Sequence, residues 1–132
     1  MGESCDLDLE RDLPDVPEVV FDHFTRIELL TTWWPSSGET DPRPGGTYRL
    51  FWDGPDVTLR GVYDVVERPS ALRFGWSWDH EAATSTVSID LTPSPSGTRV
   101  RIRQTAASAE ERDGYREGWT FFLGRLAAVL DG

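Results

Sequence analysis

The side chains with the clearest chemical potential in this sequence are large aromatic rings. The 132 residues include six tryptophans, three tyrosines and six phenylalanines, and 11% of the chain is aromatic. Flat rings, some with polar tips, are suited to line a cavity that holds an apolar or aromatic ligand, although a single ring is more often core packing. The candidate ligand-binding residues are Trp33, Trp34, Tyr48, Leu50, Trp52, Tyr63, Phe74, Trp76, Trp78, Tyr115, Gly118, Trp119 and Phe122.

Groups suited to catalysis or metal binding are few and scattered. His23 and His80 have no cysteine or histidine at metal-ligand spacing. We interpret both as surface residues, with His80 in a turn. No serine has the Gly-x-Ser-x-Gly setting of a hydrolase nucleophile, and Cys5 has no evident histidine partner. The sequence therefore predicts no catalytic residue, no metal site and no cofactor.

Three arginines alternate with apolar residues near the end of the strand-like region. Arg99, Arg101 and Arg103 share the face opposite Val100 and Ile102. They form either an anion site or cross-strand ion pairs with Asp90 and other acidic residues. Because 23 acidic residues stand against 13 basic ones, we favour ion pairs across the sheet.

Bulk composition narrows the class of partner. A net charge of −10 and a pI near 4.5 argue against nucleic acids and anionic membranes as partners. The single cysteine excludes an internal disulfide, and residues 1–10 lack a basic-then-apolar leader, so we expect a cytoplasmic location. The length predicts one domain over residues 1–132; monomer and homodimer both remain open.

A long terminal helix is the clearest local prediction. Ser108 and Glu111 form a capping box, and the helix runs to Asp131. The residues that recur at steps of three and four form one apolar stripe; they are Tyr115, Trp119, Phe122, Leu123, Leu126 and Leu130.

Three glycines interrupt the predicted helix at positions 114, 118 and 124. Each destabilises a helix interior by roughly 1 kcal/mol relative to alanine. Their missing side chains either leave volume for a ligand or allow bending at an entrance. Alternatively, they permit close packing against the sheet, or the helix starts later than Ser108.

The rest of the chain reads as strands with two short helices. Residues 5–10 alternate as a strand, and Asp15 with Glu18 caps a first helix. Leu29 to Trp34 form a second helix that Pro35 stops, and Ser36 to Gly46 read as a loop. Five strand-like runs follow at residues 47–52, 57–66, 72–79, 87–92 and 99–103. This order predicts an α+β fold (β-α-α-β-β-β-β-β-α) with a curved six-stranded antiparallel sheet around the long helix.

The order of elements and several motifs resemble a known family. The sequence is similar to the AHSA-type group (activator of heat-shock chaperone ATPase homologue-like) of the START-like, or SRPBCC, superfamily, which has the helix-grip fold. The residues that carry the resemblance cover nearly the whole chain; they are Pro17 to Thr25, Trp33-Trp34-Pro35, Arg43 to Tyr48, Gly61-Val62-Tyr63, Pro69, Leu72, Phe74, Trp76, Gly118-Trp119, Leu123 and Leu126.

The resemblance implies a pocket between sheet and long helix that typically binds an apolar small molecule. It does not imply one activity, because the superfamily includes carriers, cyclases, ligand sensors and chaperone cofactors. Two departures stand out. The chaperone activator has an additional N-terminal domain, for which we expect no counterpart in these 132 residues. Where many relatives have an acidic residue and two prolines, this chain has Val65, Arg68 and Pro69.

Three functions follow in order of preference. The first is a non-enzymatic module that binds an apolar or aromatic metabolite, lipid or natural product, with sequestration for self-protection implied by the resemblance alone. The second is a cyclase or aromatase type of enzyme, which requires groups such as Tyr48, Arg49, Tyr63 or His80 to converge in the pocket. The third is a chaperone cofactor.

Overall fold

A computed structural model describes residues 5–132 of the chain. Residues 1–4 of the predicted domain 1–132, and with them part of the segment in which we expect no leader, lie outside the described residues. The helices are α1 (Pro17–Thr25), α2 (Ile27–Leu30) and α3 (Ala109–Asp131). The strands are β1 (Leu7–Leu13), β2 (Ser37–Thr40), β3 (Thr47–Trp52), β4 (Val57–Glu67), β5 (Ala71–Trp78), β6 (Thr84–Ser94) and β7 (Gly97–Gln104).

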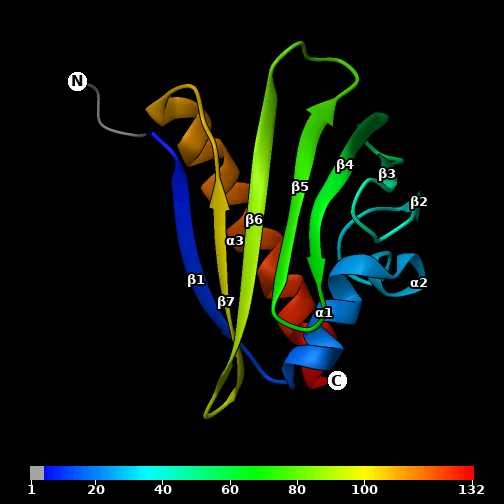
Figure 1. The fold of residues 1–132 in the computed structure, drawn as a ribbon. Coiled ribbons are helices and arrows are strands. Elements are labelled where there is room, and N and C mark those ends of the chain that lie inside the picture. The colour runs from blue at the N-terminus through cyan, green and yellow to red at the C-terminus, as the bar shows by residue number, and fades with distance from the viewer. Residues whose placement is uncertain (1–4) are drawn as a thin grey trace.

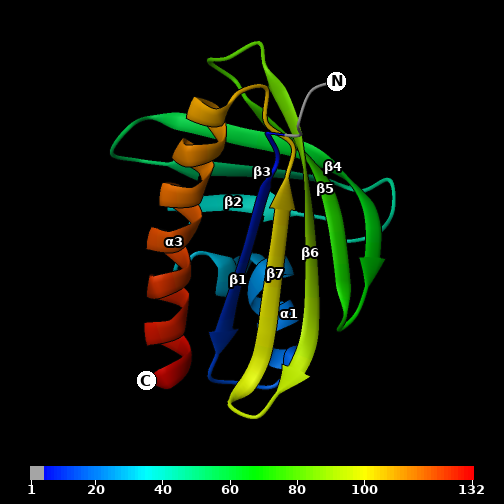
Figure 2. The same ribbon diagram turned by 90° about the vertical axis from the view of Figure 1, so that its left-hand side faces the viewer.

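The strands form a seven-stranded sheet in the order β1-β7-β6-β5-β4-β3-β2. All its pairings are antiparallel. The sheet is curved, and α3 lies along its inner face while α1 and α2 cover one end (Figures 1 and 2). The α+β helix-grip architecture predicted from the sequence is therefore confirmed. None of the helices within residues 5–132 is at once long and apolar enough to cross a membrane.

The predicted strand number of six is wrong by one. The additional strand, β2, lies inside the segment predicted as a loop, and Ser37 to Thr40 pair with residues 48–51 of β3. Edge strands can be very short and polar, and β2 has only four residues. Three of its four residues are exposed, so the pattern that marks the other strands is missing here.

The first two helices begin and end differently from the prediction. Val16, not Asp15, is the N-cap of α1, and the Asp15 carboxylate instead accepts a hydrogen bond from the Val16 N–H at 2.8 Å. The second helix is earlier and shorter than Leu29 to Trp34, since α2 ends at Leu30. Turn bonds from the N–H groups of Trp33 and Trp34 to the Leu30 carbonyl follow it. Pro35 disfavours helical geometry in the residue before it.

The long helix starts where its capping box predicts. The Ser108 hydroxyl accepts a hydrogen bond from the Glu111 N–H at 3.1 Å. The Glu111 carboxylate reaches back to the N–H of Ala107 at 3.2 Å, one residue beyond the usual partner. These bonds satisfy donors that the first turn of α3 leaves without helical partners.

Replacing Ser108 with alanine should lower the free energy of unfolding by about 1 kcal/mol, because one helix donor loses its partner. Urea unfolding followed by far-ultraviolet circular dichroism measures the change. Ser108→Asp is the matched control and should keep most of the stability, since a carboxylate also caps a helix. Equal stability of the alanine and aspartate variants would contradict a role for this cap.

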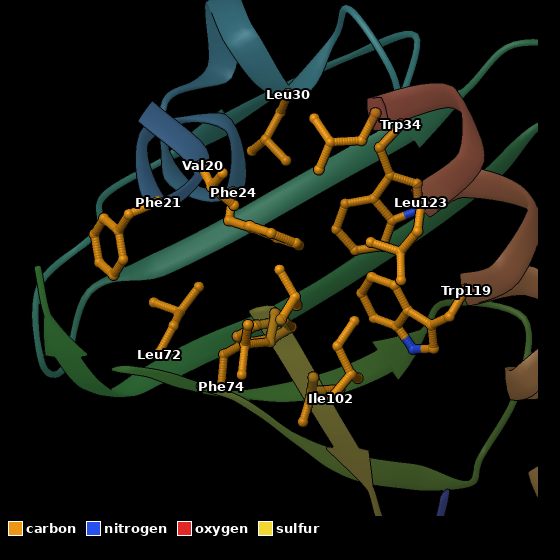
Figure 3. Close-up of a cluster of buried hydrophobic side chains, with 14 of the residues drawn as sticks. Val20, Phe21, Phe24, Leu30, Trp34, Leu72, Phe74, Ile102, Trp119 and Leu123 are labelled. Carbon is orange, nitrogen blue, oxygen red and sulfur yellow. The ribbon is translucent and has the colours of Figure 1, made fainter. Parts of the chain in front are cut away.

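The core lies between the inner face of the sheet and α3. Alternate residues of β6 and β7 are buried. The buried residues of α3 are Trp119, Leu123 and Leu126. Figure 3 shows Trp119 and Leu123 beside Trp34, with Phe74 and Ile102 of the sheet nearby. The sheet and α3 are also joined by a buried hydrogen bond from Trp119 Nε1 to Gln104 Oε1 at 2.8 Å.

Candidate functional site

A cavity of about 350 Å³ lies between α3, the segment after α2, and the ends of β3, β4 and β5. We call it the α3 cavity. Its lining is almost entirely aromatic or apolar, and five of the six tryptophans of the chain contribute to it. The lining residues are Trp34, Trp52, Pro55, Val57, Trp76, Trp78, Gly114, Tyr115, Gly118, Trp119 and Phe122.

The tryptophans hold one another in place. The ring of Trp34 lies at the centre, 5.2 Å from the Trp119 ring and 6.0 Å from the Trp76 ring, measured between centroids. Trp52 contacts both Trp34, edge to face at 5.7 Å, and Trp78 at 5.3 Å. Mutual contacts of this kind favour tilted and edge-to-face geometry. The wall is therefore ordered by ring-to-ring contacts drawn from four separate segments of the chain.

The helix glycines open the cavity on the side of α3. A Cβ atom built at Gly114, Gly118 or Gly124 would meet no neighbouring atom within 4 Å. Close packing against the sheet therefore does not explain them, and α3 includes all three. Gly114 and Gly118, one helical turn apart, both border the cavity, whereas Gly124 does not. The interpretation that missing side chains leave volume for a ligand fits Gly114 and Gly118, and nothing in the structure explains Gly124.

Eight of the thirteen candidate residues line the cavity, and the other five lie deeper. Tyr48, Leu50, Tyr63 and Phe74 surround, with Trp34, a void of only about 10 Å³. That volume is at the lower limit for one water molecule. Trp33 is fully buried and donates its indole N–H to the His23 carbonyl at 2.9 Å. These five side chains pack the core beneath the cavity.

Three lining residues are absent from the thirteen candidates: Pro55, Val57 and Gly114, of which only Gly114 was considered, as a glycine that could leave volume for a ligand. Val57 carries a usable signal, because it continues the alternation that places Leu59 and Tyr63 on the inner face of β4. Gly114 precedes Gly118 by one helical turn, so the two share a helix face. Pro55 lies in the turn between β3 and β4, where the sequence carries no such periodicity.

The mouth of the cavity continues into an open groove at the start of α3. The groove shares Trp78, Gly114 and Tyr115 with the cavity, and Glu81, Glu110 and Glu111 complete its lining together with Ser108. The Tyr115 hydroxyl donates to the Glu111 carboxylate at 3.1 Å. The mouth is thus acidic, while the interior is aromatic.

The remaining candidate groups lie outside the cavity. His23 is buried, contrary to the prediction of a surface residue, and its Nδ1 lies 2.9 Å from the Val19 carbonyl in α1. His80 is exposed in the turn after β5, as predicted. The preference for ion pairs over an anion site is confirmed, since each arginine of β7 bonds a carboxylate across the sheet. The pairs are Arg99 with Asp12 at 3.1 Å, Arg101 with Asp8 at 2.7 Å and Arg103 with Asp90 at 2.9 Å.

All three tyrosines have a raised pKa, mainly because burial disfavours the phenolate. The pKa of Tyr48 is raised by burial and by the charge of Tyr63, and that of Tyr63 by burial and by Asp41. The Tyr48 hydroxyl also donates to the Gly75 carbonyl at 2.5 Å. Burial, followed by the hydrogen bond to Glu111, raises the pKa of Tyr115 to about 12.

Rising pH should therefore destabilise the folded protein before its buried tyrosines ionise in place. The stability due to a raised tyrosine pKa is fully present below pH 10, the ordinary value, and is lost as the pH rises above it. Each well-buried tyrosine lowers the unfolding free energy by about 1.4 kcal/mol per pH unit in this range. Tyrosinate absorbance at pH about 11 should be much lower in the folded protein than in urea. Equal absorbance in both, in a sample that circular dichroism shows to be still folded at this pH, would contradict the burial of these hydroxyls.

A curved antiparallel sheet that grips a long C-terminal helix, with an aromatic cavity between them, places the protein among the helix-grip α+β proteins. Residues 16–131 match the family model for the activator of Hsp90 ATPase homolog 1-like proteins, AHSA1, and the chain belongs to this family. The resemblance drawn from its sequence motifs is confirmed.

Solved structures agree with this assignment. The AHSA1 protein of Silicibacter pomeroyi is 27% identical, with a TM-score of 0.80 over 96% of this chain and 97% of that chain. A protein of Mesorhizobium loti is 25% identical, with a TM-score of 0.83 over 96% of both chains. DynU16, a protein of the dynemicin biosynthetic locus, shares the fold at 22% identity and a TM-score of 0.86, over 98% of this chain and 48% of its own. A search among curated proteins gave no match.

Proposed function

We propose that this protein is a non-enzymatic binding protein for a flat, apolar small molecule, which it holds in the α3 cavity. The observation that carries the proposal is an aromatic space of about 350 Å³ into which two helix glycines project no side chain. Ligand pockets commonly have volumes of about 300–1,000 Å³ and apolar walls with few polar groups. A buried core would instead be filled to close packing.

The ring geometry favours a flat ligand over a flexible chain. Trp34 and Trp76 are nearly stacked, with 29° between their planes, and Trp119 is tilted by 38° to Trp34. An aromatic guest can stack on one such ring and meet the edge of another, which adds directional contacts to the burial of apolar area. Figure 3 shows the rings of Trp34 and Trp119 close together at the α3 side of the core.

The alternative function, a cyclase-type enzyme, would need polar catalytic side chains in the α3 cavity. None of Tyr48, Arg49, Tyr63 or His80 is among the residues that line the cavity. Acid–base catalysis needs such groups within hydrogen-bond reach of the substrate. Sequestration of a natural product is a form of binding that fits the proposal, and DynU16 is a protein of a biosynthetic locus with the same fold. The cytoplasmic location and the chaperone-cofactor role stay predictions from the sequence.

The proposal is tested by titrating the purified protein with 1-naphthol, phenanthrene and flavone. At least one should quench tryptophan fluorescence to saturation, because five tryptophans line the cavity. The same compound should raise the midpoint of thermal unfolding, since a ligand that binds only the folded state stabilises it. Native mass spectrometry of freshly purified protein checks for a copurified compound. No saturable response to any of the three, with no copurified compound, would overturn the proposal.

A further inference from the structure

The charges at the mouth of the α3 cavity are of one sign. Glu81, Glu110 and Glu111 line the groove that opens from it. Glu81 comes from the turn after β5 and the other two from the first turn of α3, so two separate segments direct carboxylates to one opening. Among residues 5–132, no lysine or arginine lines either the cavity or this groove.

Nearby positive groups do not cancel this charge. Arg112 forms an ion pair with Asp113 at 3.2 Å, and His80 lies 3.6 Å from the Glu81 carboxylate. The N-terminus of α3 contributes about half a positive charge, which is less than the negative charge of the three carboxylates. Arg125 lies 6.0 Å from the Phe122 ring, three residues further along α3. The balance at the mouth remains negative.

The field of these carboxylates reaches the cavity wall. Tyr115 belongs to both the cavity and the groove. Glu111 and Glu81 both contribute to the raised pKa of its hydroxyl. A ligand group placed beside Tyr115 would experience the same field, which disfavours an anion and favours a cation.

The interior of the cavity also favours a cation at its mouth. Indole rings attract ammonium groups through their negative faces, and tryptophan does so more strongly than tyrosine or phenylalanine. Trp78 and Tyr115 lie where the aromatic wall meets the acidic groove, and Trp76 lies behind them, 5.8 Å from Trp78 and 5.9 Å from Tyr115 between ring centroids. An ammonium group at this boundary would lie within reach of aromatic rings on one side and of carboxylates on the other.

We propose that the α3 cavity selects an organic cation, an apolar or aromatic body that carries a quaternary ammonium or protonated amine at the acidic mouth. This inference rests on the proposed function, because it assigns a ligand class to the same cavity. The apolar body fills the tryptophan-lined space, and the ammonium group lies between Trp78, Tyr115 and the carboxylates of the groove.

The test uses two probes of the same shape, phenyltrimethylammonium and its neutral isostere tert-butylbenzene. Both are titrated by tryptophan fluorescence at low salt and again at high salt. The cation should bind about tenfold more tightly at low salt, since cation–π attraction and the mouth carboxylates act on it alone. High salt should reduce this preference because the mouth is open to solvent.

Charge variants separate the mouth from the overall charge of the protein. The double variant Glu81→Gln with Glu110→Gln should lose most of the preference for the cation and keep its affinity for the neutral probe. The double variant Glu10→Gln with Glu67→Gln has the same net charge but changes exposed residues on β1 and β4, outside the groove. It should behave like the unchanged protein.

Equal binding of the two probes, or tighter binding of the neutral one, would overturn the inference and leave the proposed function standing. Binding of neither probe would also overturn it, and the proposed function would then be judged by the neutral aromatic panel. Loss of the preference in both double variants would assign it to net charge and overturn the role of the mouth.

Discussion

Replacing Gly118 with leucine should abolish ligand binding in the α3 cavity while the protein stays folded and becomes slightly more stable. The new side chain would enter open space, because a Cβ at this position meets no atom within 4 Å and the residue borders the cavity. Four added carbon atoms would occupy volume that the ligand needs. Leucine also favours a helix interior over glycine by about 0.8 kcal/mol, so unfolding cannot account for lost binding.

The matched control is Gly124→Leu, the same substitution in the same helix away from the cavity. Its Cβ also meets no neighbour, and it does not line the cavity. Both variants should therefore unfold at slightly higher temperature, whereas only Gly118→Leu should weaken the tightest probe of the neutral panel by at least about a hundredfold, about 2.7 kcal/mol. Unchanged affinity in Gly118→Leu, or an equal loss in both variants, would show that the ligand lies elsewhere.

The features predicted correctly from the sequence are those set by local spacing. The capping box at Ser108 and the apolar stripe that includes Trp119, Leu123 and Leu126 define α3 without reference to any other segment. Strand alternation likewise identifies the inner faces of β3 to β7, because side-chain direction has period two along a strand. Tight turns between successive strands then leave an antiparallel order as the simplest arrangement.

The features that escaped prediction depend on partners far along the chain. The strand β2 has no apolar pattern and exists because residues 48–51 of β3 offer hydrogen bonds to its edge. His23 is buried because Trp33, ten residues later, packs against the same part of α1 and bonds its carbonyl. Neither the strand β2 nor the burial of His23 can be predicted from the neighbouring residues in the sequence.

The candidate site shows the same division. Alternation places Tyr48, Leu50 and Trp52 on one face of β3, yet only Trp52 reaches the cavity. The distinction is position along the strand: Trp52 is the last residue of β3, and the cavity lies at the end of β3, the start of β4 and the end of β5. Period-two alternation predicts which face of the sheet a side chain lies on, but not how close that side chain is to α3. The list of candidate residues therefore includes core residues, such as Tyr48 and Leu50, that do not line the cavity.

Trp33 and Trp52 test this division by experiment. Replacing Trp33 with alanine should lower the free energy of unfolding by about 3–5 kcal/mol, because a large side chain leaves a buried cavity. Trp33 is fully buried, lies edge to face with Phe24 at 5.2 Å and stacks on Trp34 at 5.6 Å. The His23 carbonyl would also lose its indole donor. Urea unfolding followed by circular dichroism measures the loss.

Matched phenylalanine variants then separate stability from binding, including the case in which Trp33→Ala does not fold. Trp33→Phe should be clearly destabilised but should bind the neutral probe within about twofold of the unchanged protein, since Trp33 does not line the cavity. Trp52→Phe removes part of the cavity wall at a half-buried position, so it should weaken binding about tenfold with a smaller loss of stability. If Trp33→Phe weakened binding as much as Trp52→Phe, the ligand would have to reach the core beneath the cavity, which would contradict the place of Trp33 outside the cavity wall.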